Sequence, residues 1–402
     1  MEIREFILQT RIIHGLGSLQ KLKEEVTGRG LKRSLIVTDV GIVQSGIVDR
    51  IRSVLSEGEE LVVYDQVGHQ ATLADVRKGL QMAIDTKRDS VIPVGGGSAL
   101  VAGRAIAVAA TNPGPLTKYE GINLVKNPPL PTIAIPTTAG SGSEVSQFIP
   151  IIDDATQRKF VVGGTNCFPN VAILDGTLLS SIPPGQAGLS GVDALTHAIE
   201  AYLTTMATPI TDALALAAVK ILASKLRLLV NTADLEARQD CLVASTMANM
   251  ACTNARLGMV HTLARSINSL FPNVTYGKTI GVLLIPVMWF NLPGNIERFC
   301  DLADCIGYSR QPGTSKNDYA SLLMKGLMQL LSDIKFPKRF EKSEVSENSI
   351  STLADLAFEG LYGQGIGEAK RPMFVPGVNV QRATYDDVVM IYRAAVTGWE
   401  LS

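Results

Sequence analysis

Short β-branched runs alternate with helical patterns from about residue 34 to residue 175, and this alternation constrains the fold more than any other feature of the chain. The runs are SLIVTD (34–39), ELVVYD (60–65), SVIPVGGG (90–97), PTIAIPTT (131–138) and NVAILD (170–175). Strands separated by helices in this way predict βαβ units and a largely parallel sheet. Ligands of open parallel sheets collect outside the carboxyl ends of the strands, so a cofactor site is expected there.

Strand signals end after the segment Ser181-Ile182-Pro183-Pro184-Gly185, and Ala-, Leu- and Met-rich stretches with helical spacing follow. Proline cannot extend a helix and glycine permits unusual backbone angles, so this segment predicts a domain boundary. A length of 402 residues suits two or three domains. We therefore predict an α/β domain over residues 1–182 and an all-α domain over residues 183–402.

Composition and charge exclude several classes of protein. Thirty-seven Lys and Arg balance 38 Asp and Glu and are spread along the chain, which does not favour binding to nucleic acid or to an anionic membrane. The strongest apolar stretch, residues 279–290, is shorter than the roughly 20 residues of a membrane span. The first ten residues do not resemble a signal peptide, and five widely spaced cysteines suggest reduced thiols. We expect a cytoplasmic protein without nucleic-acid or membrane partners.

A glycine turn follows the third run of the predicted sheet. It consists of Gly95, Gly96, Gly97 and Ser98 and leads into the helical stretch ALVAGRAIAVAA (99–110). Glycines at this place let a phosphate approach backbone N–H groups at the positive end of a helix. The pattern differs from the GxGxxG dinucleotide motif, and a tight turn without a ligand is the alternative interpretation.

Two further strand ends carry polar residues. Asp39 ends the first run, where a carboxylate can bind a ribose diol and repel a 2′-phosphate, or can cap the helix that follows. Residues 136–144, PTTAGSGSE, form a hydroxyl-rich loop that can line a cofactor. The same loop contains Ser141-x-x-Glu144, which predicts a capping box at the start of a helix. These two interpretations of the loop are compatible.

Asp193 and His197 lie four residues apart in GVDALTHAIE (191–200), so on a helix they face the same way. One carboxylate oxygen and one imidazole nitrogen directed at a shared point suit a divalent metal. His261, on another predicted helix, is a third candidate ligand. A hydrogen-bonded helical pair without a metal is the alternative.

Together these motifs resemble the iron-containing (group III) alcohol dehydrogenase family along nearly the whole chain. The segments that carry the resemblance are IIHGLGSLQKL (12–22), SLIVTDVGI (34–42), GGGS (95–98), IPTTAGSGSEV (135–145), NVAILD (170–175), GVDALTHAIEAY (191–202) and NVQRATYDDVVMIY (379–392). The resemblance implies a Rossmann-like nucleotide-binding domain followed by a helical metal and substrate domain, the dehydroquinate synthase-like fold. It also implies a homodimer or larger homo-oligomer.

The resemblance further implies NAD-dependent interconversion of a small alcohol and its aldehyde or ketone, with hydride transfer in the interdomain cleft. Fe(II) or Zn(II) would be bound by Asp193, His197 and His261. The cofactor would contact Asp39 with its adenosine ribose and Gly95, Gly96, Gly97 and Ser98 with its pyrophosphate. Thr137, Thr138 and Lys159 would contact the remainder of the nucleotide. Asp39 favours NAD over NADP.

The chain departs from the family pattern at four positions. Tyr276 stands in the place of a fourth histidine ligand, and Arg265 replaces a histidine one turn beyond His261. Val101 and Arg104 stand where the glycine-turn pattern has Asp and Lys. Arg265 and Tyr276 are therefore candidate catalytic residues, Tyr276 as a phenolate ligand and Arg265 as a replacement for the metal charge. A metal-free reductase using Arg265, a nucleotide-binding homologue without turnover, and structural roles for both residues are the alternatives.

Overall fold

The structure, a computed structural model, describes residues 3–55, 59–362 and 378–399, and the chain divides into two compact units. The sheet unit comprises residues 7–182 and 234–246. The helical unit comprises residues 1–6, 183–233 and 247–402. The chain thus passes from the sheet unit into the helical unit between Ile182 and Pro183, at the proline pair.

The sheet unit contains a six-stranded parallel sheet with the strand order β1-β9-β6-β4-β2-β3. Its strands are β1 (Arg11–His14), β2 (Arg33–Val37), β3 (Glu60–Tyr64), β4 (Ser90–Gly95), β6 (Ile133–Pro136) and β9 (Val171–Leu174). Each of the five runs identified in the sequence forms one of these strands. The predicted parallel α/β architecture is therefore confirmed.

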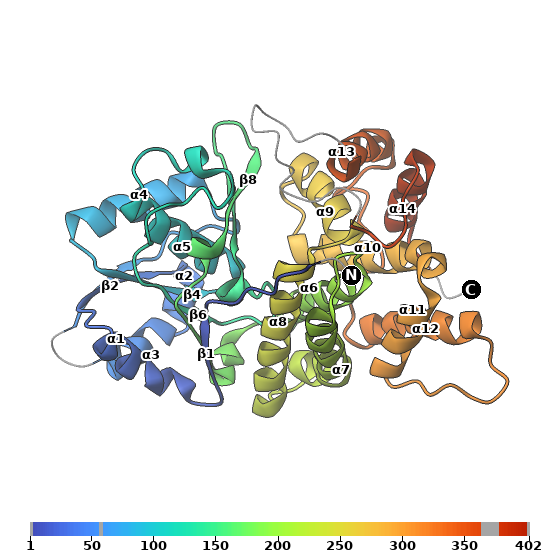
Figure 1. Ribbon diagram of the computed structural model, residues 1–402, viewed down its shortest axis with the longest axis horizontal. Helices are drawn as coiled ribbons and strands as arrows, with labels where there is room; N and C mark the ends of the chain where they lie inside the picture. The colour runs from blue at the N-terminus through green and yellow to red at the C-terminus, as the bar shows by residue number, and fades with distance from the viewer. Residues whose placement is uncertain (1–2, 56–58, 363–377, 400–402) are drawn as a thin grey trace. The chain divides into compact units, whose positions relative to one another are not determined.

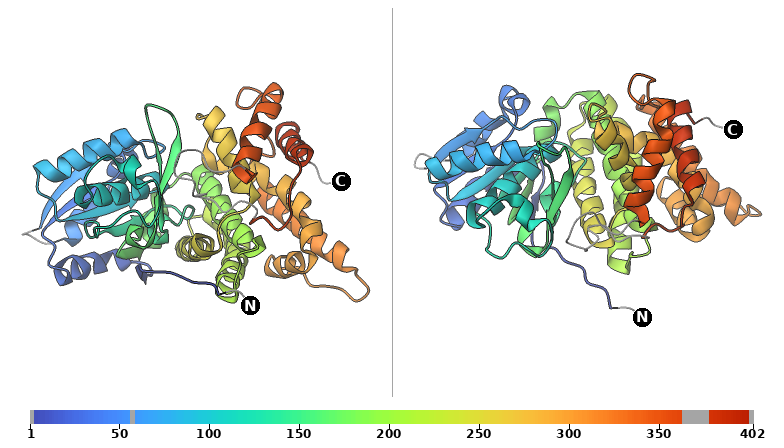
Figure 2. Two further views of the ribbon diagram at one scale, coloured as in Figure 1. Left: turned by 45° about the horizontal axis from the view of Figure 1, so that its top comes forward. Right: turned by 90° about the horizontal axis from the view of Figure 1, so that it is seen from above.

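Helices cover both faces of this sheet (Figure 1). They are α1 (Leu22–Gly28), α2 (Val40–Gln44), α3 (Ile47–Val54), α4 (Leu73–Asp85) and α5 (Gly97–Thr111). Leu35 and Val37 of β2 belong to the core formed with α4 and α5, whereas Ile36 belongs to the core formed with α1 and α3. Alternate residues of a strand face opposite sides, so one apolar run supplies both cores. Figure 2 shows the strands between the two helical layers from two further directions.

A second, three-stranded sheet was not predicted. It consists of β5 (Gly121–Ile122), β8 (Lys159–Gly163) and β7 (Phe148–Ile152), in the order β5-β8-β7, with β7 and β8 antiparallel. Pro150 lies inside β7 and weakens its signal, because proline lacks an N–H group and is tolerated mainly in edge strands. The position of β7 at the edge of this sheet explains how the proline is accommodated.

The expected capping box at Ser141 and Glu144 is wrong. Residues Ser143–Val145 form a single 3₁₀ turn, and β7 follows it. Glu144 is 2% exposed, and its Oε1 accepts a hydrogen bond from the Thr246 hydroxyl at 2.7 Å. The carboxylate therefore binds another element of the sheet unit instead of capping a local helix.

The described part of the helical unit contains helices and no strands. The helices are α6 (Pro184–Leu203), α7 (Pro209–Asn231), the end of α8 (Leu235–Ala255), α9 (Met259–Leu270), α10 (Tyr276–Asn291), α11 (Ile296–Cys305), α12 (Lys316–Asp333), α13 (Ile350–Tyr362) and α14 (Tyr385–Thr397). Proline begins both α6 and α7, a position at which its missing N–H group costs nothing. Among the described residues, no helix has the length and apolarity needed to cross a membrane.

Candidate active site

Helix α6 directs three polar side chains into the interior of the helical unit. Asp193, His197 and Glu200 follow one another at spacings of four and three residues, so they share one face of the helix. Their exposed fractions are 9%, 7% and 2%. A surface helix would direct such groups to solvent, so their burial needs partners or a ligand.

Helix α9 brings His261 to this face. Nε2 of His261 lies 3.5 Å from Oδ1 of Asp193, and its ring stacks on His197 with centroids 4.5 Å apart and planes inclined by 21°. One potential ligand atom from each of the three residues lies within 4.8 Å of the other two. The structure thus brings together the three side chains that the sequence proposed as metal ligands.

The chemistry of these three groups fits a divalent metal. Nε2 of His261 is buried, and its contact with Asp193 at 3.5 Å is too long and poorly directed for a good hydrogen bond, which is costly unless another partner occupies the site. Two imidazoles and one carboxylate are a ligand set that Fe(II) and Zn(II) both accept. Three protein ligands also leave a coordination position for a water or a substrate oxygen.

Glu200 orients His261 and was missed in the sequence. Its Oε2 lies 2.6 Å from Nδ1 of His261, and its Oε1 accepts the backbone N–H of Val260 at 2.6 Å. Burial alone would lower the pKa of His261, but Glu200 and Asp193 outweigh it and raise the pKa above the ordinary value. The spacing of Glu200, seven residues after Asp193 on the same helix face, was the signal that could have identified it.

Arg265 and Tyr276 lie beside the same histidine. Arg265 is one turn beyond His261 on α9 and donates a hydrogen bond to the Tyr276 hydroxyl, with Glu200 as a nearby opposite charge. Burial lowers the pKa of Arg265, and these neighbours oppose that effect. Tyr276 begins α10, and its ring centroid lies 6.3 Å from that of His261. Both candidate catalytic residues therefore adjoin the three potential ligands.

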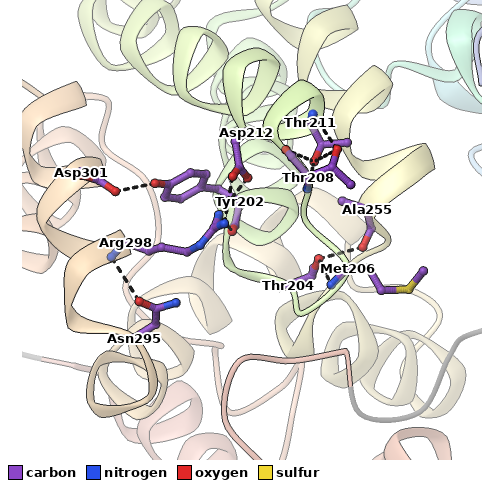
Figure 3. Close-up of polar contacts among 10 residues, drawn as sticks. All are labelled: Tyr202, Thr204, Met206, Thr208, Thr211, Asp212, Ala255, Asn295, Arg298 and Asp301. Carbon is purple, nitrogen blue, oxygen red and sulfur yellow. Dashed lines mark hydrogen bonds and ion pairs between the residues drawn. The ribbon is translucent and has the colours of Figure 1, made fainter. Parts of the chain in front are cut away.

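A polar cluster binds the carboxyl end of α6 at Tyr202, which lies two residues beyond Glu200 (Figure 3). Arg298 of α11 donates to the Tyr202 carbonyl at 2.5 Å and to both carboxylate oxygens of Asp212 at 2.8 and 2.9 Å. Its guanidinium lies 4.3 Å from the Tyr202 ring centroid, and the Tyr202 hydroxyl donates to Asp301. A cation at a helix carboxyl terminus stabilises the unpaired carbonyls there, so Arg298 helps to fix the helix that carries Asp193.

In the sheet unit, Asp39 and the glycine turn lie together. Oδ1 of Asp39 accepts the N–H of Ile42 at 3.0 Å and caps α2. A Cβ atom placed on Gly95 would lie 3.6 Å from Oδ2 of Asp39. The φ angle of Gly95 is +141°, which residues with a side chain rarely adopt. The capping role is therefore present, and the second carboxylate oxygen lies beside the turn.

The hydroxyl loop, residues 136–144, packs against this turn. A Cβ atom on Gly96 would lie 3.5 Å from Cγ2 of Thr138, and one on Gly97 would lie 3.0 Å from both side-chain atoms of Ser141. A side chain at position 97 would therefore press on Ser141, whereas a Cβ at position 96 would make ordinary van der Waals contact with Thr138. The glycines thus permit a close approach of two backbone segments at the amino end of α5.

The other predicted cofactor residues differ in their surroundings. The N–H of Thr137 donates to the Gly95 carbonyl at 3.0 Å, which ties the loop to β4. The Ser98 hydroxyl donates to the His69 carbonyl at 2.6 Å. Lys159 begins β8, on the second sheet, and is exposed. The structure therefore brings Asp39, the glycine turn and the hydroxyl loop together, whereas Lys159 belongs to a different sheet.

Comparisons with known proteins agree along the chain. A family model described as iron-containing alcohol dehydrogenase matches residues 9–176, and one described as the C-terminal region of the Fe-containing alcohol dehydrogenase family matches residues 188–396. The 1,3-propanediol dehydrogenase of Citrobacter freundii is 36% identical over 334 residues, which cover 82% of this chain and 86% of that protein. The NAD-dependent methanol dehydrogenase of Bacillus methanolicus is 30% identical over 393 residues, covering 97% and 99%.

A solved structure extends this agreement to three dimensions. The crystal structure of a 1,3-propanediol oxidoreductase superposes with a TM-score of 0.91 at 32% identity, covering 98% of this chain and 100% of that one. The predicted family, fold and enzyme class are thereby confirmed. The chain belongs to the iron-containing alcohol dehydrogenase family.

Proposed function

We propose that this enzyme uses NAD to interconvert a small alcohol and its aldehyde or ketone, with Fe(II) or Zn(II) held by Asp193, His197 and His261. The observation that carries the proposal is the buried convergence of three ligand atoms within 4.8 Å of one another. A metal held there would act as a Lewis acid on the substrate oxygen. Glu200 would keep Nε2 of His261 directed at the site, because it occupies the other ring nitrogen.

The sheet unit supports the cofactor part of the proposal. The second carboxylate oxygen of Asp39 suits a ribose diol, and its charge would repel the additional phosphate of NADP. Backbone N–H groups at Gly96 and Gly97 would bind the pyrophosphate. Thr138 and Lys159 are proposed as further nucleotide contacts. The name of the Bacillus methanolicus relative, which specifies NAD, supports the same choice.

Arg265 and Tyr276 are proposed to act on the substrate oxygen. A guanidinium only donates hydrogen bonds, so the Tyr276 oxygen accepts from Arg265, and the hydroxyl proton is directed to another acceptor. We propose that the substrate oxygen is that acceptor. In oxidation the substrate carbon gives its hydride to NAD⁺, and the proton of the substrate's own hydroxyl group is released. The products are therefore the aldehyde, NADH and H⁺.

Metal content and turnover test this proposal together. Protein purified without chelator should contain about one metal per chain and oxidise NADH with small aldehydes. Asp193→Ala and His261→Ala should lose the metal and the activity while retaining NADH binding. His14→Ala, which changes an exposed histidine at the end of β1, is the matched control and should retain both. Full activity in metal-free Asp193→Ala would overturn the metal assignment.

A second candidate is a metal-free reductase in which Arg265 polarises the substrate carbonyl. The hydrogen bond between Arg265 and Tyr276 beside His261 is the observation that favours it. This candidate predicts turnover without metal that is lost in Arg265→Gln and insensitive to added Fe(II) or Zn(II). NADH binding with neither metal nor turnover would exclude both candidates and leave a nucleotide-binding homologue.

A further inference from the structure

Arg104 is a buried charge that has no part in the proposed chemistry. It lies two turns into α5, the helix that begins at the glycine turn, and its exposed fraction is 2%. Burial lowers the pKa of Arg104 to about 10, and the nearby carboxylate of Glu144 opposes this effect. A buried guanidinium is tolerated only when its five N–H groups find acceptors.

Four backbone carbonyls satisfy this requirement. Nη1 of Arg104 donates to Ser143 at 3.0 Å and to Phe148 at 3.1 Å. Nη2 donates to Ser146 at 2.5 Å and to Cys167 at 2.8 Å, and Nε also donates to Cys167 at 3.3 Å. All five N–H groups are thus used, and the acceptors belong to two segments that lie far from α5 in the sequence.

The first of these segments continues directly from the hydroxyl loop. The front of the hydroxyl loop, at Thr138 and Ser141, packs against Gly96 and Gly97. Arg104 binds the end of the loop at Ser143. One helix therefore contacts the loop at two places, once through its amino-terminal glycines and once through the Arg104 side chain. The spacing between loop and turn depends on both contacts.

We infer that Arg104 is a positioning residue, which holds the hydroxyl loop at the distance from the glycine turn that a dinucleotide pyrophosphate requires. This inference rests on the proposed use of NAD. A guanidinium is planar and presents five donors in a fixed fork, whereas a lysine ammonium has three donors at one point. Lysine therefore cannot bind four carbonyls in the same arrangement, although it retains the charge. The family pattern has lysine at this position together with an aspartate where this chain has Val101, so Arg104→Lys restores only one of the two residues.

The test compares Arg104→Lys with a matched substitution elsewhere in the sheet unit. Arg88 has a side chain that is 5% exposed, and it donates to the carbonyls of Thr86 and Glu60 at the amino-terminal end of the strands. Arg88→Lys thus also removes hydrogen bonds from a buried guanidinium to backbone carbonyls. These bonds lie at the end of the strands opposite Gly95. Calorimetric titration measures the affinity of each variant for NADH and for ADP-ribose, and thermal melting measures its stability.

Arg104→Lys should bind NADH and ADP-ribose roughly tenfold more weakly, an effect typical of losing charge-assisted hydrogen bonds. Its kcat at saturating NADH should fall less than its KM rises. Arg88→Lys should show a comparable loss of Tm with unchanged affinities. Equal affinities in Arg104→Lys and the unaltered protein would overturn the inference, as would a loss of Tm without a loss of affinity.

A second variant tests the same inference if Arg104→Lys does not fold. The double variant Arg104→Met, Glu144→Gln removes the buried guanidinium together with the buried carboxylate whose charge acts on it, so that neither charge is left buried without the other. It should fold and bind ADP-ribose weakly, and normal binding would overturn the inference.

If the unaltered protein binds no NADH, the proposed function fails independently of this inference. Hydrogen exchange of residues 136–148 then tests the positioning role. Faster exchange is expected in Arg104→Lys than in Arg88→Lys, and equal exchange would overturn the inference.

Discussion

Glu200 sets the direction in which His261 offers its nitrogen. The carboxylate holds Nδ1 at 2.6 Å and also binds the Val260 N–H at the start of α9. It therefore fixes both the ring and the backbone that carries it. Carboxylates placed in this way behind a metal-binding histidine typically raise its affinity for the metal.

Glu200→Gln should reduce metal affinity by about 10- to 100-fold, because an uncharged amide orients the imidazole less firmly. Competition with a chromogenic chelator measures this affinity directly. NADH affinity should stay unchanged, since Asp39 and the glycine turn belong to the other unit. Glu236→Gln, which changes an exposed glutamate in the first turn of α8, is the control. Equal metal affinity in Glu200→Gln would contradict the orienting role.

At the residue scale the sequence locates ligands better than the groups that support them. Asp193, His197 and His261 are readily identified because their residue types and spacing are distinctive. Glu200 and Arg104 are ordinary charged residues in sequence, and only the folded chain shows what surrounds them. For Arg104 the acceptors are backbone carbonyls, and the identity of those residues carries no signal for such a contact.

The start of β2 and the start of β4 are joined by Asp89. Its carboxylate accepts the N–H groups of Lys32 and Arg33 at 3.0 and 3.1 Å and the Ser90 hydroxyl at 2.9 Å. Burial alone would raise the pKa of Asp89, but these hydrogen bonds and the Arg33 charge outweigh it and lower the pKa below 3.8. The ionised carboxylate therefore stabilises the folded chain at neutral pH.

Asp89→Asn should lower the free energy of unfolding by about 1–2 kcal/mol at pH 7, as expected for hydrogen bonds to a charged group. Because the folded-state pKa is depressed, this contribution is present above pH 3.8 and is lost as the pH falls through the folded-state value. Urea unfolding between pH 7 and pH 2 should show the difference between the two proteins narrowing as the pH falls below 3.8. Asp49→Asn, at an exposed position, should change little, and a gap that persists in acid would contradict this account.

At the element scale the parallel sheet follows from the sequence because its inner strands, β2, β4, β6 and β9, are compact apolar runs buried on both faces. The β7–β8 hairpin does not, because its pairing depends on neighbours instead of a local pattern. The same holds for the hydroxyl loop. Its capping-box pattern is genuine as a local preference, but burial of Glu144 against Thr246 overrides it.

At the scale of the whole molecule, the two sets of candidate ligand-binding residues are divided between the units. Asp39 and residues 95–98 lie in the sheet unit, and Asp193, His197 and His261 lie in the helical unit. A ligand that binds only folded protein stabilises the unit that supplies its contacts.

Differential scanning calorimetry should therefore show two transitions that respond to different ligands. NADH should raise the midpoint of one and Zn(II) that of the other, each by an amount that grows with the logarithm of ligand concentration. Asp39→Ala should abolish only the NADH shift, and His261→Ala only the Zn(II) shift. A single transition that both ligands shift equally would contradict this division.

Pro150 also changes the hydrogen-bond donors that β7 presents at the edge of the second sheet. An edge strand normally presents unpaired N–H groups on which another chain can add a strand and begin a fibril. Pro150 removes one such donor in the middle of β7, and the N–H of Ile152, two residues further on, donates to the Ala71 carbonyl at 3.0 Å. The outer edge of β7 thus presents fewer free donors on which a strand of another chain could be added.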